Sequence, residues 1–280
     1  MRRVLLFLTA SAVLPAASPV EQARDLFERT DYQQSLAILL AQPQKDAGTV
    51  QLIGQDYFML GEYKKSTEAL EKAAALAPGD AGIFHWLGRA YGRRAETGNP
   101  FTAPGYATKA RQSFEKSVHL DPSNKDATGD LLDFYLDAPG FLGGGLQKAE
   151  ALAELIGKLD PAEEHYARAV IDERRKDYQG AEQQLRRALD LAPRQASRFV
   201  ALAKYLGEHG KIEESDALFE QAARMSPDDP RVMFDRARTY VDQRRNLGEA
   251  RELLEKYLRS SLTPDDPPRR DAEALLKKIT

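Results

Sequence analysis

Prolines recur along this chain at intervals that match a short helical unit. They stand at Pro78, Pro122, Pro161, Pro193 and Pro227, so the last two gaps are 32 and 34 residues and the first two are 44 and 39. Good helix formers such as Ala, Leu, Glu and Arg dominate between them. Because a helix cannot continue through an interior proline, each proline is expected to end one unit. The pattern predicts an all-helical array with insertions in its early units.

A large, a small and an aromatic residue recur within the units at fixed spacing. Residues 86–91 read Trp-Leu-Gly-Arg-Ala-Tyr, and related patterns begin at Leu52 and Phe199. The spacing places these side chains on one helical face, where the small residue allows a partner helix to approach closely. Tyr57, Tyr91, Tyr135 and Leu206 form a recurring row that is better explained by core packing than by binding.

These segments resemble the tetratricopeptide repeat, a helix–turn–helix unit of about 34 residues. The resemblance implies a right-handed α-solenoid and covers almost all of the chain after residue 18. Its units are assigned to residues 20–44 (degenerate), 47–80, 81–124, 125–161, 162–195, 196–229 and 230–264. Residues 267–280 are predicted to form a capping helix. Its Ala272, Leu275, Leu276 and Ile279 should cover the last repeat, and its Arg269, Arg270, Lys277 and Lys278 should face water.

The first eighteen residues differ from the rest. Arg2 and Arg3 precede an apolar stretch at 4–13, and Pro15 and small residues follow at 16–18. This order is typical of a cleavable secretory signal, with cleavage near Ala17 or Ser18, and the apolar stretch is shorter than the roughly 17–25 residues of a membrane span. A buried N-terminal helix is the alternative. The chain contains no cysteine, so no lipoprotein anchor is expected, and the predicted location is the periplasm or the extracellular space.

The remaining composition argues against several classes of function. A net charge of −3 gives no general attraction to nucleic acid. The four histidines are scattered without metal-ligand spacing, so no metal or other cofactor is expected. Gly143–Gly145 opens a helix but lacks the Gly-Lys-Ser/Thr arrangement of a phosphate loop, and no catalytic constellation is evident.

Two insertions distinguish the third and fourth units. Residues 94–106 and 137–145 are predicted to be loops that emerge side by side at one edge of the solenoid. Such loops are often functional, although neutral drift at a tolerant turn explains them equally well. The edge residues expected to be exposed, or to pack on each other, are Phe101, Tyr106 and Phe141.

In proteins with this repeat, the first helices of successive units line a concave groove. The resemblance maps this groove onto Gln51, Gln55, Phe58, Met59, His85, Arg89, Arg93, Asp133, Asp137, Tyr166, Val170, Arg174, Val200, Lys204, Phe234 and Arg238. His85, Arg89 and Arg93 share one helical face and could hold a carboxylate or an acidic peptide. The alternative, which we favour, is a solvated stripe that pairs with Asp133 and Asp137. The Lys and Asn pattern that clamps chaperone C-termini in some members of the family is absent.

The sequence thus favours a non-enzymatic, monomeric scaffold that binds a protein or peptide in its groove, helped by the two insertions. The alternatives are a structural protein that stacks end to end and, less favoured, an enzyme with a disguised site. The charged segment 267–280 argues against open-ended stacking.

Overall fold

The computed structural model describes residues 18–263 and 266–279, so residues 1–17 of the predicted signal lie outside the described part. These residues form fifteen α-helices and one 3-10 helix, and no strand occurs among them. In chain order the helices are α1 (Pro19–Glu28), α2 (Tyr32–Leu40), α3 (Ala47–Met59), α4 (Tyr63–Leu76), α5 (Ala81–Thr97), α6 (Ala103–Leu120), α7 (Lys125–Asp137), η1 (Gly140–Leu142), α8 (Leu146–Gly157), α9 (Pro161–Arg174), α10 (Tyr178–Leu191), α11 (Ala196–Glu208), α12 (Ile212–Met225), α13 (Pro230–Asp242), α14 (Leu247–Arg259) and α15 (Arg269–Lys278).

The helices are arranged as seven successive pairs, α1/α2 to α13/α14, followed by α15. To within one residue, each pair falls in one of the seven units that the sequence assigns. Ser18, the last residue of the predicted signal, caps α1: its hydroxyl accepts from the Glu21 N–H at 3.2 Å, and its own N–H donates to the Glu21 carboxylate at 2.6 Å.

Short turns within most pairs share one backbone feature. Between the two helices of five pairs stands a residue with positive φ, namely Thr30, Gly61, Lys176, Gly210 and Arg244. This left-handed conformation reverses the chain in few residues, and glycine adopts it without strain. The α5/α6 and α7/α8 connections lack this short turn and contain the insertions instead.

Small residues let the two helices of a pair approach closely. A Cβ atom on Gly54 would lie 2.6 Å from Leu70 Cγ, and one on Gly88 would lie 2.5 Å from Phe114 Cδ1. Buried serines tie the helices together, because the Ser66 hydroxyl donates to the Gly54 carbonyl at 2.8 Å. The Ser215 hydroxyl donates to the Ala203 carbonyl at 2.7 Å in the same way. The large–small–aromatic spacing read from the sequence is therefore the packing rule of the pair.

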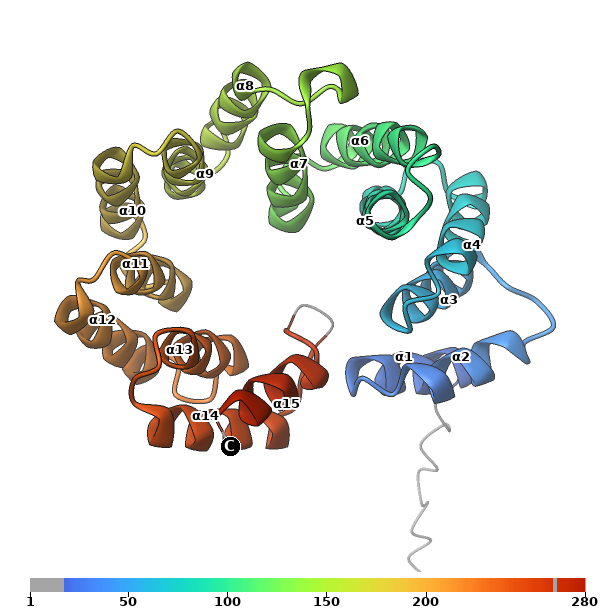
Figure 1. The fold of residues 1–280 in the computed structure, drawn as a ribbon. Coiled ribbons are helices and arrows are strands. Elements are labelled where there is room, and N and C mark those ends of the chain that lie inside the picture. The colour runs from blue at the N-terminus through green and yellow to red at the C-terminus, as the bar shows by residue number, and fades with distance from the viewer. Residues whose placement is uncertain (1–17, 264–265, 280) are drawn as a thin grey trace, which may run out of the picture.

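The pairs curve into a ring (Figure 1), with α5, α7, α9, α11 and α13 toward its centre and α6, α8, α10, α12 and α14 on its outside. The two ends of the array come together where α15 approaches α1 and α2. Burial raises the pKa of Tyr32 on α2 to about 12, and the charges of Arg270 and Arg269 on α15 act in the opposite direction, which requires the two ends to be close.

The third unit corrects the prediction of a long loop at residues 94–106. Helix α5 continues to Thr97 and α6 already begins at Ala103, so only residues 98–102 connect them. Pro104 stands in the first turn of α6, where a proline removes no helical hydrogen bond. The insertion therefore lengthens two helices. In the fourth unit, by contrast, residues 138–145 contain only the short η1.

Helix α15 packs on the last pair through Ala272, Leu275, Leu276 and Ile279. Arg269 does not face water as expected. Its guanidinium donates to the Leu258 carbonyl and, at 3.0 Å, to the Ser260 carbonyl, so it fastens α15 to the end of α14.

Candidate functional site

The inner face of the ring is the surface that includes Arg89 of α5, Asp133 of α7, Tyr166 of α9, Lys204 of α11 and Asp235 of α13. Two hollows lie along it. The N-terminal hollow has a volume of about 440 Å³ and is lined chiefly by Phe58, Arg89, Gly92, Arg93, Phe114, Asp133, Phe134 and Leu142. The C-terminal hollow has a volume of about 490 Å³ and is lined chiefly by Lys125, Glu163, Tyr166, Val170, Glu173, Arg198, Val200, Ala201, Lys204, Glu208, Arg231 and Asp235.

A charge in the N-terminal hollow acts on a residue of the C-terminal hollow. Asp133 lines the N-terminal hollow, and its charge is among those that raise the pKa of Tyr166 in the C-terminal hollow, where burial is the larger cause. The two hollows are therefore neighbours on the inner face.

The predicted basic stripe on α5 is held by contacts within the protein. His85 is buried, and its Nε2 lies 2.8 Å from Asp130 Oδ2 on α7. The Arg89 guanidinium lies 3.8 Å from the same carboxylate and covers the Trp86 ring at 4.5 Å and the Phe58 ring. Both side chains therefore have a partner within the protein, and Asp130, not Asp133 or Asp137, is that partner on α7.

Arg93, the third member of the stripe, pairs with Glu96 on its own helix and lies over the Tyr63 ring at 5.3 Å. Asp137 pairs with Arg174 of α9. Asp133 has no ion pair among the described residues. Its pKa is raised by burial first and then by the nearby charges of Asp130 and Asp137.

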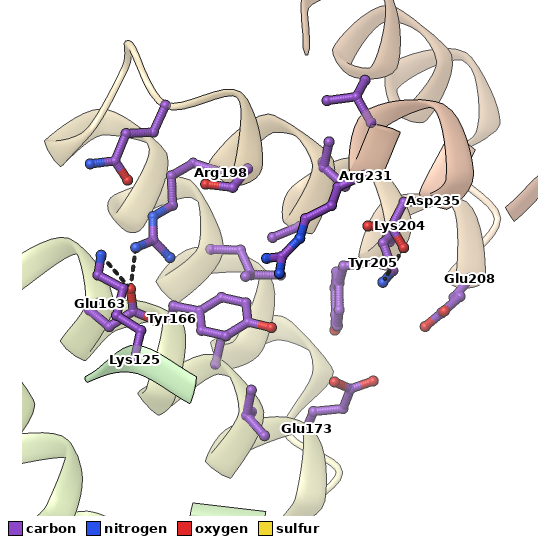
Figure 2. A pocket seen from close by; sticks show the side chains of 18 of the residues that line it. Lys125, Glu163, Tyr166, Glu173, Arg198, Lys204, Tyr205, Glu208, Arg231 and Asp235 are labelled. Carbon is purple, nitrogen blue, oxygen red and sulfur yellow. Dashed lines mark hydrogen bonds and ion pairs between the residues drawn. The ribbon is translucent and has the colours of Figure 1, made fainter. Parts of the chain in front are cut away.

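In the C-terminal hollow, cations and anions from successive inner helices face one another (Figure 2). Arg198 donates to Glu163 at 2.5 Å, and Lys125 reaches the same carboxylate at 2.9 Å. On the opposite wall Lys204 donates to Asp235 at 3.1 Å. Tyr166 extends between the two groups, with its ring beside Arg198.

Glu173 and Glu208 lie on the side of this hollow away from Arg198 and Glu163 (Figure 2). Neither has an ion pair among the described residues. The pKa of Glu208 is raised, mainly by burial and then by the charge of Glu173. The charges of Lys204, His209 and Arg238 act in the opposite direction.

Other predicted groove residues differ in their environment. Gln51, Gln55 and Met59 are half-buried on α3, and Val200 is buried in the wall of the C-terminal hollow. Arg238 is exposed and lies 3.6 Å from Asp242. Phe234 is not a groove residue: only 3% of it is exposed, and its ring packs on Tyr257 in the core of the last pair.

The predicted edge residues also separate into two kinds. Phe101 and Phe141 are 95% and 83% exposed. Tyr106 is half-buried, because its ring stacks on Tyr91 and its hydroxyl accepts from Arg94. The second insertion contacts helix α6, since Arg111 donates to the Leu142 carbonyl at 3.1 Å.

Sequence reasoning missed Phe134, Glu173, Arg198, Glu208 and Arg231. Two of these could have been found by extending the helical register, because Glu173 follows Val170 by three residues and Glu208 follows Lys204 by four. Arg198 and Arg231 stand in the first turns of α11 and α13, where the mapped pattern had no position.

The described part of the chain lacks two other kinds of feature. It contains no group of three or more His, Asp or Glu side chains that could hold a metal ion. None of its helices has the length and apolar character needed to cross a membrane.

Comparison with known proteins supports the repeat. Residues 200–267 match the family model described as tetratricopeptide repeat. No curated protein matches the chain by sequence.

Solved structures share its architecture. A tetratricopeptide repeat protein from Parabacteroides merdae is 15% identical, with coverage of 93% of this chain and 97% of that one and a TM-score of 0.54. The human IFIT1 dimer with PPP-AAAA is 18% identical, with coverage of 86% of this chain and 54% of that one and a TM-score of 0.51. At such identities the likeness concerns the fold alone. The chain is an α-solenoid of tetratricopeptide-type helix pairs.

Proposed function

We propose that this protein is a non-enzymatic scaffold that binds a segment of another protein along the inner face of its ring. Solenoids of this kind present extended concave surfaces for binding other chains. The observation that carries the proposal is the pair of hollows, about 440 and 490 Å³, on the inner face.

The lining of the hollows suits a peptide. Phe58 and Phe134 are half-buried and line the N-terminal hollow, and Tyr166 is similarly available in the C-terminal one. Aromatic anchors in such hollows supply most of the affinity at protein interfaces, and charges at their rims supply specificity. A surface that spans several helices is longer than one small molecule, so an extended or helical segment matches it better.

We propose the cell envelope as the place of action. The support is the positive, apolar and small-residue order at 2–18, most of which lies outside the described residues. We also propose a monomer, because α15 covers the last helix pair. Light scattering of the purified protein tests the monomer.

The test fills the hollows with tryptophan. Gly92 lines the N-terminal hollow and a Cβ there meets no atom within 4 Å, and Ser197 is exposed and lines the C-terminal hollow. The variant Gly92→Trp/Ser197→Trp should therefore fold and yet obstruct both hollows. The matched control is Gln183→Trp/Gly248→Trp, at exposed positions of the outer helices α10 and α14.

Wild type is used as bait in an envelope extract, and the captured partner is purified for titration against both variants. Binding should weaken more than roughly tenfold for the inner-face variant, since anchor positions at an interface contribute ~2 kcal/mol or more. The outer-face control should bind as wild type does, and circular dichroism should show equal helicity in all three. Equal affinity of both variants would reject the inner face and direct attention to Phe101 and Phe141.

A further inference from the structure

The cations of the two hollows are all occupied by carboxylates of this chain. Each Lys and Arg side chain that lines a hollow has a carboxylate oxygen within 3.8 Å among the described residues. The pairs are Lys125 with Asp160 and Glu163, Arg198 with Glu163, Lys204 with Asp235, Arg231 with Asp266, Arg89 with Asp130, and Arg93 with Glu96.

The anions are in excess. Asp133, Glu173 and Glu208 line the hollows, and in the described part of the chain no Lys, Arg or His nitrogen lies within 4.0 Å of their carboxylates. They belong to three consecutive inner helices, α7, α9 and α11. Two other lining acids are accounted for: Asp229 caps α13, and Asp126 stands in the first turn of α7, where the helix dipole favours a negative charge.

Two of these three carboxylates are repelled by neighbouring carboxylates. The pKa values of Asp133 and Glu208 are both raised, first by burial and then by neighbouring carboxylates, which are Asp130 and Asp137 in one case and Glu173 in the other. A bound cation would offset this repulsion, and the resulting electrostatic attraction would favour binding.

The C-terminal hollow also holds a donor without an acceptor. Arg198 is only 6% exposed, and although its terminal nitrogen donates to Glu163, its Nε has no hydrogen-bond partner among the described residues. An unpaired buried donor costs free energy, so an acceptor brought by a ligand is favoured there. The carbonyl oxygen of a peptide backbone is such an acceptor, and Val170, Val200 and Ala201 provide apolar wall beside it.

We infer that the segment bound on the inner face is cationic, with Lys or Arg side chains interspersed among apolar ones. The cations pair with Asp133, Glu173 and Glu208, the apolar side chains enter the hollows, and a backbone carbonyl approaches Arg198. This inference rests on the proposed function and specifies its partner. It replaces the acidic peptide that the stripe of His85, Arg89 and Arg93 suggests in the sequence, because those groups already have partners on this chain.

The probes are two short fluorescent peptides of equal length and leucine content, one with lysine and one with glutamate at the charged positions. The inner-face variant is Asp133→Asn/Glu173→Gln/Glu208→Gln. The control variant, Glu154→Gln/Asp190→Asn/Glu252→Gln, removes three exposed acids from the outer helices α8, α10 and α14 that have no ion pair with any described residue. Both variants change the net charge equally, so a general attraction of the acidic protein for the peptide affects them alike.

Fluorescence anisotropy at low salt should show that wild type and control bind the lysine peptide equally. The inner-face variant should bind it roughly tenfold more weakly, since three ion pairs are lost. The difference should shrink at high salt, because salt screens these exposed pairs. The glutamate peptide should not bind.

Equal weakening in both variants would overturn the inference, because it would show only a net-charge effect. A preference of wild type for the glutamate peptide, or no binding of either peptide, would overturn it too. Binding of the glutamate peptide that Gly92→Trp/Ser197→Trp abolishes would leave the inner face as the binding surface and refute only the cationic partner. If the tryptophan variant still binds the lysine peptide as wild type does, the proposed function fails with the inference.

Discussion

The interface within each helix pair and the inner face of the ring meet on α5, where two glycines stand one turn apart. Gly88 is at the interface, and a Cβ there would lie 2.5 Å from Phe114. Gly92 faces the N-terminal hollow, and a Cβ there meets nothing within 4 Å. At the interface, close packing determines which residue fits. On the inner face there is room for larger side chains, and the positions differ mainly in their charge.

The largest loss of stability is expected when an interface side chain is removed. Phe219→Ala deletes a ring that is fully buried between α11, α12 and the next pair, where it meets Tyr240. Loss of that contact and the cavity left behind should lower the free energy of unfolding by ~3–5 kcal/mol. Phe101→Ala, at a residue 95% exposed, should change it by less than ~0.5 kcal/mol. Urea denaturation followed by circular dichroism compares them, and similar midpoints would contradict the packing described.

Overpacking the interface should lower the free energy of unfolding by less than removing the Phe219 ring does. It should still distinguish Gly88 from Gly92. Gly88→Trp forces a large ring against Phe114 and should lower the free energy of unfolding by ~1–3 kcal/mol or more. Gly92→Trp extends into the hollow and should leave stability close to that of wild type. The same denaturation experiment measures both. Equal losses would mean that the N-terminal hollow closes in solution.

Carboxylates with raised pKa values occur on the inner face and also in the packing between successive helix pairs, but for different reasons. At the interface of α2 and α3, burial raises the pKa of Asp56 from 3.8 to about 7, against the lowering effect of the hydrogen bond from the Ser35 hydroxyl. On the inner face, crowding by other carboxylates adds to the burial of Asp133. A buried acid with a raised pKa binds its proton more tightly in the folded state, so its contribution to stability is present below the unfolded pKa and is lost as pH rises through about 7.

Asp56→Asn tests this, because asparagine imitates the protonated acid. Between pH 6 and pH 8 the wild type should lose stability relative to the variant by ~1.4 kcal/mol, the equivalent of one pKa unit. Urea midpoints of both proteins at several pH values give the difference. A difference that stays constant with pH would show that Asp56 is ionised throughout and that its burial is not maintained in solution.

The contrast between the interface within a pair and the inner face also explains which features could be predicted from the sequence. The helix pairs were predictable, because Gly88 and Phe114, or Ser215 and Ala203, meet within one unit according to a periodic rule. The fold class was predicted correctly for this reason. The prediction of a loop at 94–106 was wrong in extent, because Pro104 and Gly105 are typical of loops but are also accepted in the first turn of a helix.

The charge of the inner face was not predictable, since it depends on pairs between units. His85 meets Asp130, and Arg198 meets Glu163, across 45 and 35 residues of sequence. A helical register shows that Arg89 and Arg93 share a face, but it cannot show which carboxylate the next unit brings beside them. Phe234 illustrates the same limit, because a shift of the face by part of a turn places it in the core.

The smallest expected effect is that of a glycine-to-alanine substitution on the free energy of unfolding, and its sign should differ between the inner face and the interface within a pair. Gly92→Ala adds a Cβ in open space to the interior of α5 and lowers the entropy of the unfolded chain, so it should raise the free energy of unfolding by ~0.5–1 kcal/mol. Gly54→Ala makes the same chemical change in α3, but its Cβ would lie 2.6 Å from Leu70 Cγ, a fully buried side chain that cannot move away. This variant should be less stable than wild type, and urea denaturation of both proteins measures the signs. If both substitutions stabilise the protein, the helices of the second pair are not packed as closely as the glycine requires. If both destabilise it, the space beside Gly92 is filled in solution, and the N-terminal hollow is then unavailable to a partner.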